Sequence, residues 1–233
     1  MPVQLEKPFI SANALFGNLL QPGASVTILA SKDYAFAHEA GVYVADTNEV
    51  WFTSNLLKNG DGRRVEVSRV DIDTGVVTVV DVPTLRLGNG ACPYNGGILF
   101  CDQGSMDAPS QLVWVSPQCS SKTEVLLDNY AGRAFNSLND VIALDHPAGE
   151  LIFFTDPPYG REQGFRPSCQ MPPAVHCFDP FTGSVRMVAD GLAHPNGIAF
   201  SPDGETCYVT DTSHINGSGV LDPSLPSTMW VHP

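Results

Sequence analysis

The sequence predicts an all-β fold of the β-propeller type, and three observations predict it. The 233-residue chain is 43% hydrophobic but only 16% charged, with 21 Gly and 19 Pro, a composition typical of short strands and many turns. One layout of two apolar runs joined by a turn occurs four times along the chain. Helical periodicity is absent apart from a turn or two near residues 12–20.

The four copies share one order of residues. Each begins with a polar residue, continues through an apolar run and a turn, and closes with a second apolar run that ends in a small residue. Aligned on their last residues, the copies recur at a period of roughly 48 to 55 residues, which is the size of a four-stranded propeller blade. They occupy residues 39–53, 89–101, 139–155 and 196–210.

Turn residues lie where the two runs of a repeat meet. Asn95-Gly96 and Asp203-Gly204 are strong hairpin signals because both dipeptides tolerate positive φ. Residues 147–149 (Pro-Ala-Gly) form a weaker equivalent in the third repeat. Each first hairpin is therefore expected to consist of two antiparallel strands.

A second hairpin follows the first in three of the repeats. Residues 67–80 alternate around Thr74-Gly75, and residues 175–188 alternate around Thr182-Gly183. Residues 112–115 and 124–127 take the same place in the second repeat. Each repeat therefore predicts four short strands.

The fourth repeat ends differently. Residues 228–233 resemble the opening strand of a second hairpin, and the sequence given stops there. We expect one incomplete propeller domain over residues 1–233, with about four blades plus the start of the next hairpin and with residues 1–33 leading into it. Because an open ring leaves sheet edges unpaired, we expect a truncated form of a longer protein that lacks its last blades.

Charge and cysteine content restrict the partners. With 25 Asp and Glu against 12 Lys and Arg, the net charge of −13 repels phosphate backbones and anionic membranes, so neither nucleic acid nor a membrane is expected as a partner. No secretory signal is visible at the N-terminus, which favours a cytoplasmic location. The six cysteines contain no C-x-x-C pair, and Cys101 and Cys207 are expected to be buried thiols. The oligomeric state stays open.

The polar residue that opens each repeat is the candidate for chemistry. In a propeller the first strand of each blade lines the central channel, so equivalent positions converge near the axis. One carboxylate and several amide oxygens at that point suit a hard cation, Ca²⁺ above all. The alternative is that these Asn residues only form turns. The four residues are Glu39, Asn89, Asn139 and Asn196.

Three aspartates directly follow the second run of their repeats: Asp102, Asp156 and Asp211. We expect them to form structural hydrogen bonds between blades. Residues 156–159 are expected to reach the rim of the pocket.

Several motifs together resemble the SMP-30/gluconolactonase family. The amino-acid sequence of residues 34–44 and 51–55 most resembles the fungal lactonohydrolase branch. The resemblance runs from about residue 8 to the end. The motifs are His38-Glu39-Ala40, Asn136-Ser-Leu-Asn-Asp140, Phe154-Thr-Asp-Pro-Pro-Tyr-Gly160 and His194-Pro-Asn-Gly-Ile-Ala-Phe-Ser-Pro-Asp-Gly204.

This resemblance implies a six-bladed β-propeller that hydrolyses lactones with the help of a divalent metal. Glu39 matches the acidic metal ligand of the family, and Asn196 matches its amide ligand. Asn139 matches an asparagine that touches metal or substrate, and Asp140 matches the residue beside it.

The remaining expectations concern the pocket and its contents. Asn89, His38 and Tyr159 are expected around the substrate or the metal. Ca²⁺ is the expected ion, with Zn²⁺, Mg²⁺ and Mn²⁺ as alternatives, and the partner is a small-molecule lactone that the sequence does not identify.

The sequence departs from the family in two places. The family uses an aspartate from a later blade as ligand and base, and no residue matches it, because Asp203 belongs to a hairpin turn. Ser137 stands where the animal branch has an arginine. The catalytic base is therefore unassigned, and we expect weak metal binding and poor hydrolysis.

Two other interpretations stay open. One is a related calcium propeller that acts as an esterase or phosphotriesterase, or a strictosidine-synthase-like protein without hydrolysis. The other is a truncated, non-catalytic propeller scaffold, which the expected loss of the last blades favours.

Overall fold

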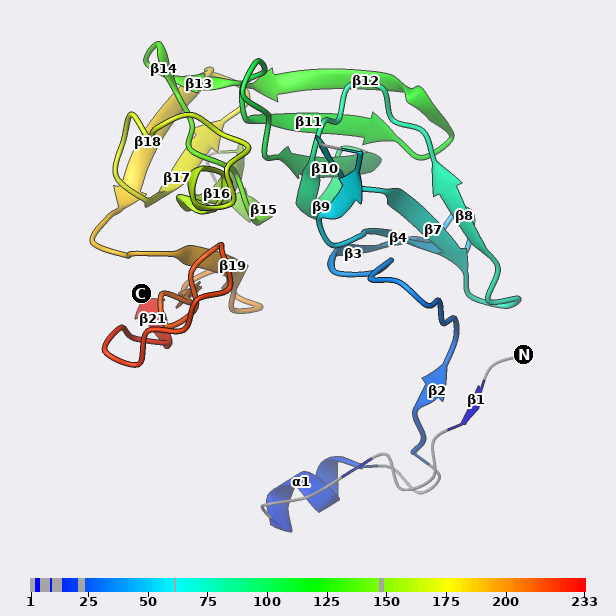
Figure 1. The fold of residues 1–233 in the computed structure, drawn as a ribbon. Helices are drawn as coiled ribbons and strands as arrows, with labels where there is room; N and C mark the ends of the chain where they lie inside the picture. Colours follow the sequence, from blue (N-terminus) through cyan, green and yellow to red (C-terminus); the bar gives the residue numbers. More distant parts are fainter. Residues whose placement is uncertain (1–2, 5–8, 10–13, 21–23, 61, 147–148) are drawn as a thin grey trace.

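The computed structural model describes residues 3–4, 9, 14–20, 24–60, 62–146 and 149–233. Within these residues, three four-stranded sheets and one three-stranded sheet follow one another as the blades of a β-propeller (Figure 1). All neighbouring strands within a blade are antiparallel. The expected all-β propeller is therefore confirmed.

Each blade takes its strands in chain order. Blades 1 and 2 are β3 (Glu39–Val44), β4 (Glu49–Thr53), β7 (Val67–Asp71) and β8 (Val77–Val80), then β9 (Gly88–Tyr94), β10 (Gly97–Asp102), β11 (Gln111–Ser116) and β12 (Cys119–Leu127). Blades 3 and 4 are β15 (Val141–His146), β16 (Gly149–Asp156), β17 (Ala174–Asp179) and β18 (Ser184–Ala189), then β19 (Pro195–Phe200), β20 (Cys207–Asp211) and β21 (Thr228–His232).

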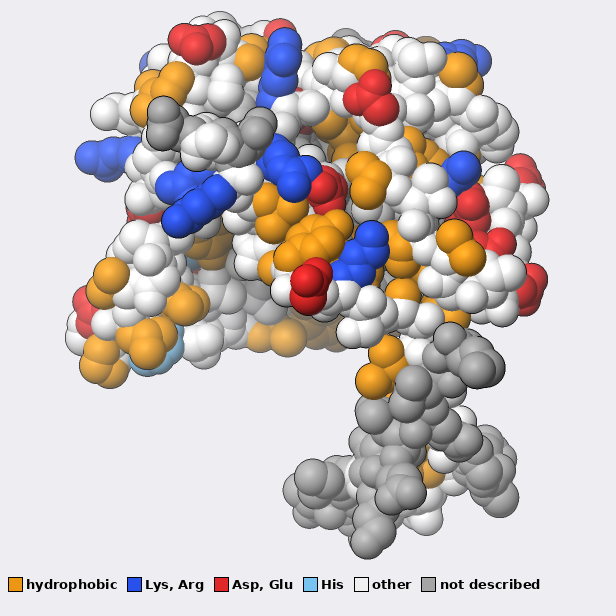
Figure 2. Space-filling model, turned by 45° about the vertical axis from the view of Figure 1, so that its right-hand side comes forward, with side chains coloured by type: hydrophobic (Ala, Val, Ile, Leu, Met, Phe, Trp, Pro, Cys, Tyr) orange, Lys and Arg blue, Asp and Glu red, His pale blue; other side chains and the backbone are white. Residues whose placement is uncertain are grey.

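The shorter elements lie outside the blade sheets. They are β1 (Val3–Gln4), α1 (Ala14–Leu19), β2 (Thr27–Ile28), β5 (Leu57–Asn59), β6 (Gly62–Arg64), β13 (Asn129–Tyr130), β14 (Arg133–Ala134) and α2 (Tyr159–Glu162). In the described part of the chain, no helix has the length and hydrophobicity to cross a bilayer. Figure 2 shows charged and hydrophobic side chains interspersed over one face of the molecule.

The predicted turns account for most of the hairpin geometry. Asn95 and Gly96 both have positive φ, 44° and 67°, as their hairpin requires. The turn at Asp203-Gly204 is wider, because Ser201 N donates to Thr206 O and the Asp203 carboxylate accepts from Glu205 N. Pro147 and Ala148 of the third predicted turn lie outside the described residues.

Strand β10 of blade 2 contributes side chains to two hydrophobic cores, one shared with blade 1 and one shared with blade 3. Its continuous apolar run has almost no exposed surface, and successive side chains point to opposite faces of the strand. Ile98 and Phe100 pack with blade 1, whereas Leu99 and Cys101 pack with blade 3. One strand therefore serves two cores. Cys101 is a buried thiol as expected, while Cys207 is only half-buried.

The strand-end aspartates form structural hydrogen bonds, but within a blade rather than between blades. Asp102 accepts from Leu87 N at 2.9 Å, Asp156 from Ser137 N at 2.9 Å, and Asp211 from His194 N at 3.0 Å. Each acceptor lies at the end of a second strand, and each donor precedes the first strand of the same blade. The prediction of links between blades was wrong because antiparallel pairing brings those two positions together.

His176 on β17 is a buried titratable group. Its ring stacks on Phe154 and touches Tyr130 and Phe135, and neither ring nitrogen has a hydrogen-bond partner among the described residues. Burial lowers its pKa to about 4. Because the unfolded chain titrates near 6.5, folding stability is retained above pH 6.5 and lost as the pH falls from 6.5 towards 4.

Replacing His176 with Phe is therefore expected to flatten the acid side of the stability profile. The variant should lose about 2 kcal/mol less stability than the wild type between pH 7 and about 4.5, since no buried imidazole has to stay neutral. Urea unfolding across this pH range measures the difference. The exposed His232, changed to Gln, is the control. Parallel curves for wild type and His176→Phe would show that another group sets the acid limit.

Candidate functional site

A cavity of about 370 Å³ lies at the end of the blades where the first strands begin. Six of the seven predicted site residues line it, and the seventh, Asp140, follows directly in the chain after one of them. The lining residues from the starts of the first strands are His38, Glu39, Asn89, Asn139 and Asn196. Those from the connections after the second strands are Asn55, Gln103, Tyr159, Gln163, Thr212, Ile215, Asn216, Gly217 and Gly219.

Hydrogen bonds between blades hold the strand starts together. Thr53 Oγ1 donates to Asn89 O at 3.0 Å, linking blades 1 and 2. Gly90 N donates to Asn139 O at 2.8 Å, and Thr155 Oγ1 donates to Asn196 O at 2.7 Å. The same polar position of each repeat is thereby held beside its neighbour, so side chains far apart in sequence share one cavity.

Glu39 enters the cavity through an irregular strand start. Ala40 has a φ of 60°, and the pairing of β3 with β4 shifts register between Glu39 and Val42. Strand alternation predicts opposite directions for His38 and Glu39, yet His38 Nδ1 lies 3.6 Å from Glu39 Oε1. Burial raises the pKa of Glu39, His38 lowers it, and the negative charge of Asp140 raises it.

The two predicted amide ligands have their nitrogens engaged. Asn139 Nδ2 donates to Asn89 Oδ1 at 3.4 Å, and its own Oδ1 is buried without a hydrogen-bond partner in the described part of the chain. Asn196 Nδ2 donates to the Tyr159 hydroxyl at 3.1 Å and to Thr212 Oγ1 at 3.4 Å. A buried carbonyl oxygen without a donor costs about 1–3 kcal/mol, which a cation would offset.

The donor set fits a hard divalent cation. One carboxylate from Glu39 and amide oxygens from Asn139 and Asn196 are the ligand types that Ca²⁺ accepts, with waters or substrate completing its shell. Within the described residues, no three or more His, Cys, Asp and Glu side chains are grouped so that they could hold a metal ion.

Asp140 does not line the cavity but stabilises the strands that form it. Its Oδ1 accepts from Val141 N at 2.9 Å, and its Oδ2 accepts from Ile198 N of blade 4 at 3.0 Å. Burial raises its pKa, and the two backbone donors lower it. The carboxylate therefore ties the start of the first strand of blade 3, next to Asn139 in the chain, to the first strand of blade 4.

Gly90 is packed too closely for a larger residue. A Cβ there would lie 2.6 Å from Asn139 O, 2.6 Å from Asp140 Oδ1 and 2.9 Å from Asp140 Cα. Gly90→Ala is therefore expected to destabilise the fold by about 1–3 kcal/mol and to displace Asn139, weakening cation binding. Urea unfolding and calcium titration measure the two effects. Gly41→Ala, with nothing within 4 Å of its added Cβ, is the matched control. Equal stability and calcium affinity for the two variants would contradict the close packing.

Sequence reasoning missed part of the cavity. Three of the missed lining residues share one repeat position, two residues after the end of the second apolar run: Asn55, Gln103 and Thr212. This shared position could have predicted that they line the cavity. Another missed pair is Glu162 and His194. His194 Nε2 lies 2.8 Å from Glu162 Oε1, and Glu162 Oε2 accepts from Gly217 N at 2.6 Å. This pair holds the loop that contains Gly217 against α2.

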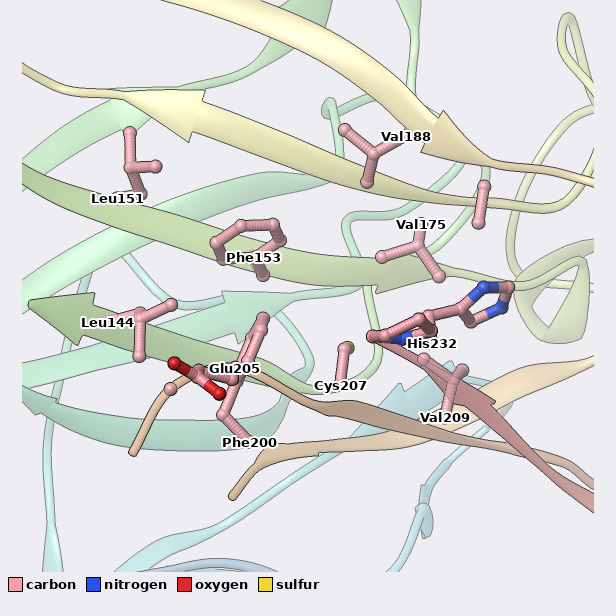
Figure 3. A pocket seen from close by; sticks show the side chains of 13 residues that line it. Leu144, Leu151, Phe153, Val175, Val188, Phe200, Glu205, Cys207, Val209 and His232 are labelled. Carbon is pink, nitrogen blue, oxygen red and sulfur yellow. The ribbon is translucent and has the colours of Figure 1, made fainter. Parts of the chain in front are cut away.

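A second cavity of about 440 Å³ lies between blades 3 and 4 (Figure 3). Phe153, Val175 and Leu151 point into it from blade 3, opposite Val209 and Phe200 of blade 4. Its lining is mainly hydrophobic, with Glu205 as its carboxylate. It offers no convergent set of polar donors, so the polar cavity at the strand starts is the candidate site.

Known proteins resemble this chain over most of its length. Residues 37–216 match the SMP-30/gluconolactonase/LRE-like region. Lactonohydrolase oryL of Aspergillus oryzae is 33% identical over 195 residues, covering 81% of this chain and 43% of that protein. Lactonohydrolase oryH of the same species is 28% identical over 246 residues, covering 81% of this chain and 51% of that protein.

A solved structure also resembles this chain. The gluconolactonase of Xanthomonas campestris is 28% identical, with a TM-score of 0.65, over 88% of this chain and 63% of that chain. The chain spans about half the length of the curated relatives that it matches.

Proposed function

Because the chain belongs to the SMP-30/gluconolactonase family, we propose that it hydrolyses lactones at the polar cavity with a divalent cation, Ca²⁺ in the first place. One observation carries this proposal: a single carboxylate and a buried, unpartnered amide oxygen converge where first strands from several blades begin. The names of the relatives, lactonohydrolase and gluconolactonase, agree with a small-molecule lactone as substrate.

In this proposal Glu39, Asn139 and Asn196 hold the cation. When bound, the ion would supply Lewis-acid polarisation of the lactone carbonyl. The cation binders need fixed rotamers, which Tyr159 and Thr212 provide for Asn196 and which Asn89 provides for Asn139.

Other side chains would bind and orient the lactone. Asn55, Gln103 and Gln163 line the cavity with amide groups that can both donate and accept hydrogen bonds, as the hydroxyls of a sugar lactone require. Among the described lining residues Glu39 is the one carboxylate, so a separate carboxylate base for the attacking water is not among them.

The experiment that tests this function combines calcium titration with a lactonase assay on the 233-residue chain. We expect calcium binding by calorimetry, weak because the cation has one protein carboxylate. Hydrolysis of glucono-1,4-lactone in a pH-stat should stop with a chelator and return with added Ca²⁺. Absence of both calcium binding and hydrolysis would overturn the proposal.

The single carboxylate favours a second candidate, a propeller scaffold that binds calcium without turnover. The same experiment separates the two. Calcium binding without hydrolysis of a lactone, an aryl ester or a phosphotriester supports the scaffold, whereas faster turnover of the ester or phosphotriester supports the related calcium propellers.

A further inference from the structure

The hairpin of β5 and β6 is connected to two residues that line the polar cavity, Asn55 and Gln163. It is inserted between β4 and β7 and pairs only with itself in the described structure. Asn55, two residues before it, lines the cavity. At its other end, Arg63 Nη2 donates to the backbone oxygen of Gln163 at 3.5 Å, and Gln163 also lines the cavity. Both ends of the hairpin are therefore attached to the cavity wall.

Two positive charges face each other on this hairpin. Lys58 and Arg63 are directly opposite partners in the antiparallel register, so their side chains leave the same face of the hairpin. Both are exposed. Like charges directly opposite in a strand pair destabilise it, so an anion held between them would remove a repulsion as well as add an attraction.

Neither charge is neutralised by the described part of the protein. The ion pairs found there involve His38, Arg64, Arg69 and His194, and none includes Lys58 or Arg63. The neighbouring Arg64 shows the contrast, because it leaves the other face of the hairpin opposite Leu57 and pairs with Glu66. In a chain with 25 acidic and 12 basic residues, these two side chains form no ion pair with another described residue.

We propose that Lys58 and Arg63 bind an anionic substituent, a carboxylate or a phosphate monoester, carried by the lactone whose ring occupies the polar cavity. Arg and Lys are the residues that bind these groups through charge-assisted hydrogen bonds. The proposal rests on the proposed function and adds a substrate class to it: lactones with a second, negatively charged group.

The test compares three lactones: neutral glucono-1,4-lactone, glucaro-1,4-lactone with a carboxylate, and 6-phosphogluconolactone with a phosphate. The double variant Lys58→Gln/Arg63→Gln should raise KM for the charged lactones about tenfold and leave kcat and the neutral lactone unchanged. Lys122→Gln/Arg133→Gln, which removes two exposed charges elsewhere, is the matched control. A KM rise for one charged lactone alone identifies carboxylate or phosphate as the recognised group.

If KM for both charged lactones stays at the wild-type value in Lys58→Gln/Arg63→Gln, as in the control double variant, the proposal is overturned while lactone hydrolysis is left intact. If no lactone is hydrolysed, the proposed function fails, and the anion site is tested by NMR titration with glucarate and 6-phosphogluconate. Chemical-shift changes on the hairpin that are lost in Lys58→Gln/Arg63→Gln support the site. No binding of either anion to the wild type overturns it.

Discussion

Glu39→Gln is expected to reduce lactone hydrolysis by on the order of 10² to 10³-fold and to abolish calcium binding in the titration. The change keeps the shape of the side chain but removes the one carboxylate among the described residues that line the cavity. Amide oxygens alone would then face the cation, and calcium affinity falls with the charge of the ligands. Calorimetry and the pH-stat assay measure both losses.

The stability of this variant should not fall. Burial raises the pKa of Glu39, which means that folding disfavours its charged form, so the neutral amide removes a cost. Glu124→Gln, an exposed change of the same kind on β12, is the matched control and should retain activity and calcium binding. Unchanged calcium binding and hydrolysis in Glu39→Gln would exclude the carboxylate as a cation ligand.

Arg166→Met is expected to have the largest effect on stability, a loss of about 3–5 kcal/mol. Arg166 is 5% exposed, and its guanidinium donates to four backbone oxygens. Nε donates to Asn136 O at 2.9 Å and Nη2 to Phe135 O at 2.8 Å, both before blade 3, and Nη1 donates to Ser105 O and Ala108 O of blade 2. Met fills the space but removes all four hydrogen bonds, and of the four acceptors Ala108 O keeps one described donor, Ser105 N at 3.0 Å.

Arg166→Met should also weaken calcium binding. The two segments that Arg166 joins are close in sequence to Gln103 and Asn139, which line the cavity. Burial raises the pKa of the neighbouring Asp156 to about 7, and the Arg166 charge opposes this rise. Urea unfolding and calcium titration of Arg166→Met test the prediction. Arg166→Lys keeps the charge without the planar fork and should be intermediate, while the exposed Arg133→Gln should match the wild type. A loss below about 1 kcal/mol for Arg166→Met would mean that water replaces the guanidinium.

The repeat pattern was enough to predict the propeller and to bring Glu39, Asn89, Asn139 and Asn196 to one cavity. It succeeded because strand period, turn residues such as Asn95-Gly96 and blade length are all local properties. Whether these residues bind a cation stays a prediction.

What the sequence could not predict depends on contacts between distant segments or on unusual backbone. The positive φ of Ala40, which turns His38 and Glu39 to one side, could not be predicted, because alanine rarely adopts that conformation. The buried Arg166 reaches oxygens up to 61 residues away, and Glu162 holds Gly217 from 55 residues away. The β5–β6 hairpin is an insertion in one blade, so no repeat predicts it.

The cavity draws its two kinds of residues from different parts of each blade. The cation-binding candidates lie at the starts of inner strands, fixed by bonds between blades, whereas most other lining residues lie in the connections between second and third strands. These connections differ from blade to blade, with a hairpin in blade 1 and a helical turn in blade 3. Evolution can therefore lengthen, shorten or exchange parts of them to change substrate range, provided that Tyr159 and Thr212 keep their hydrogen bonds to Asn196.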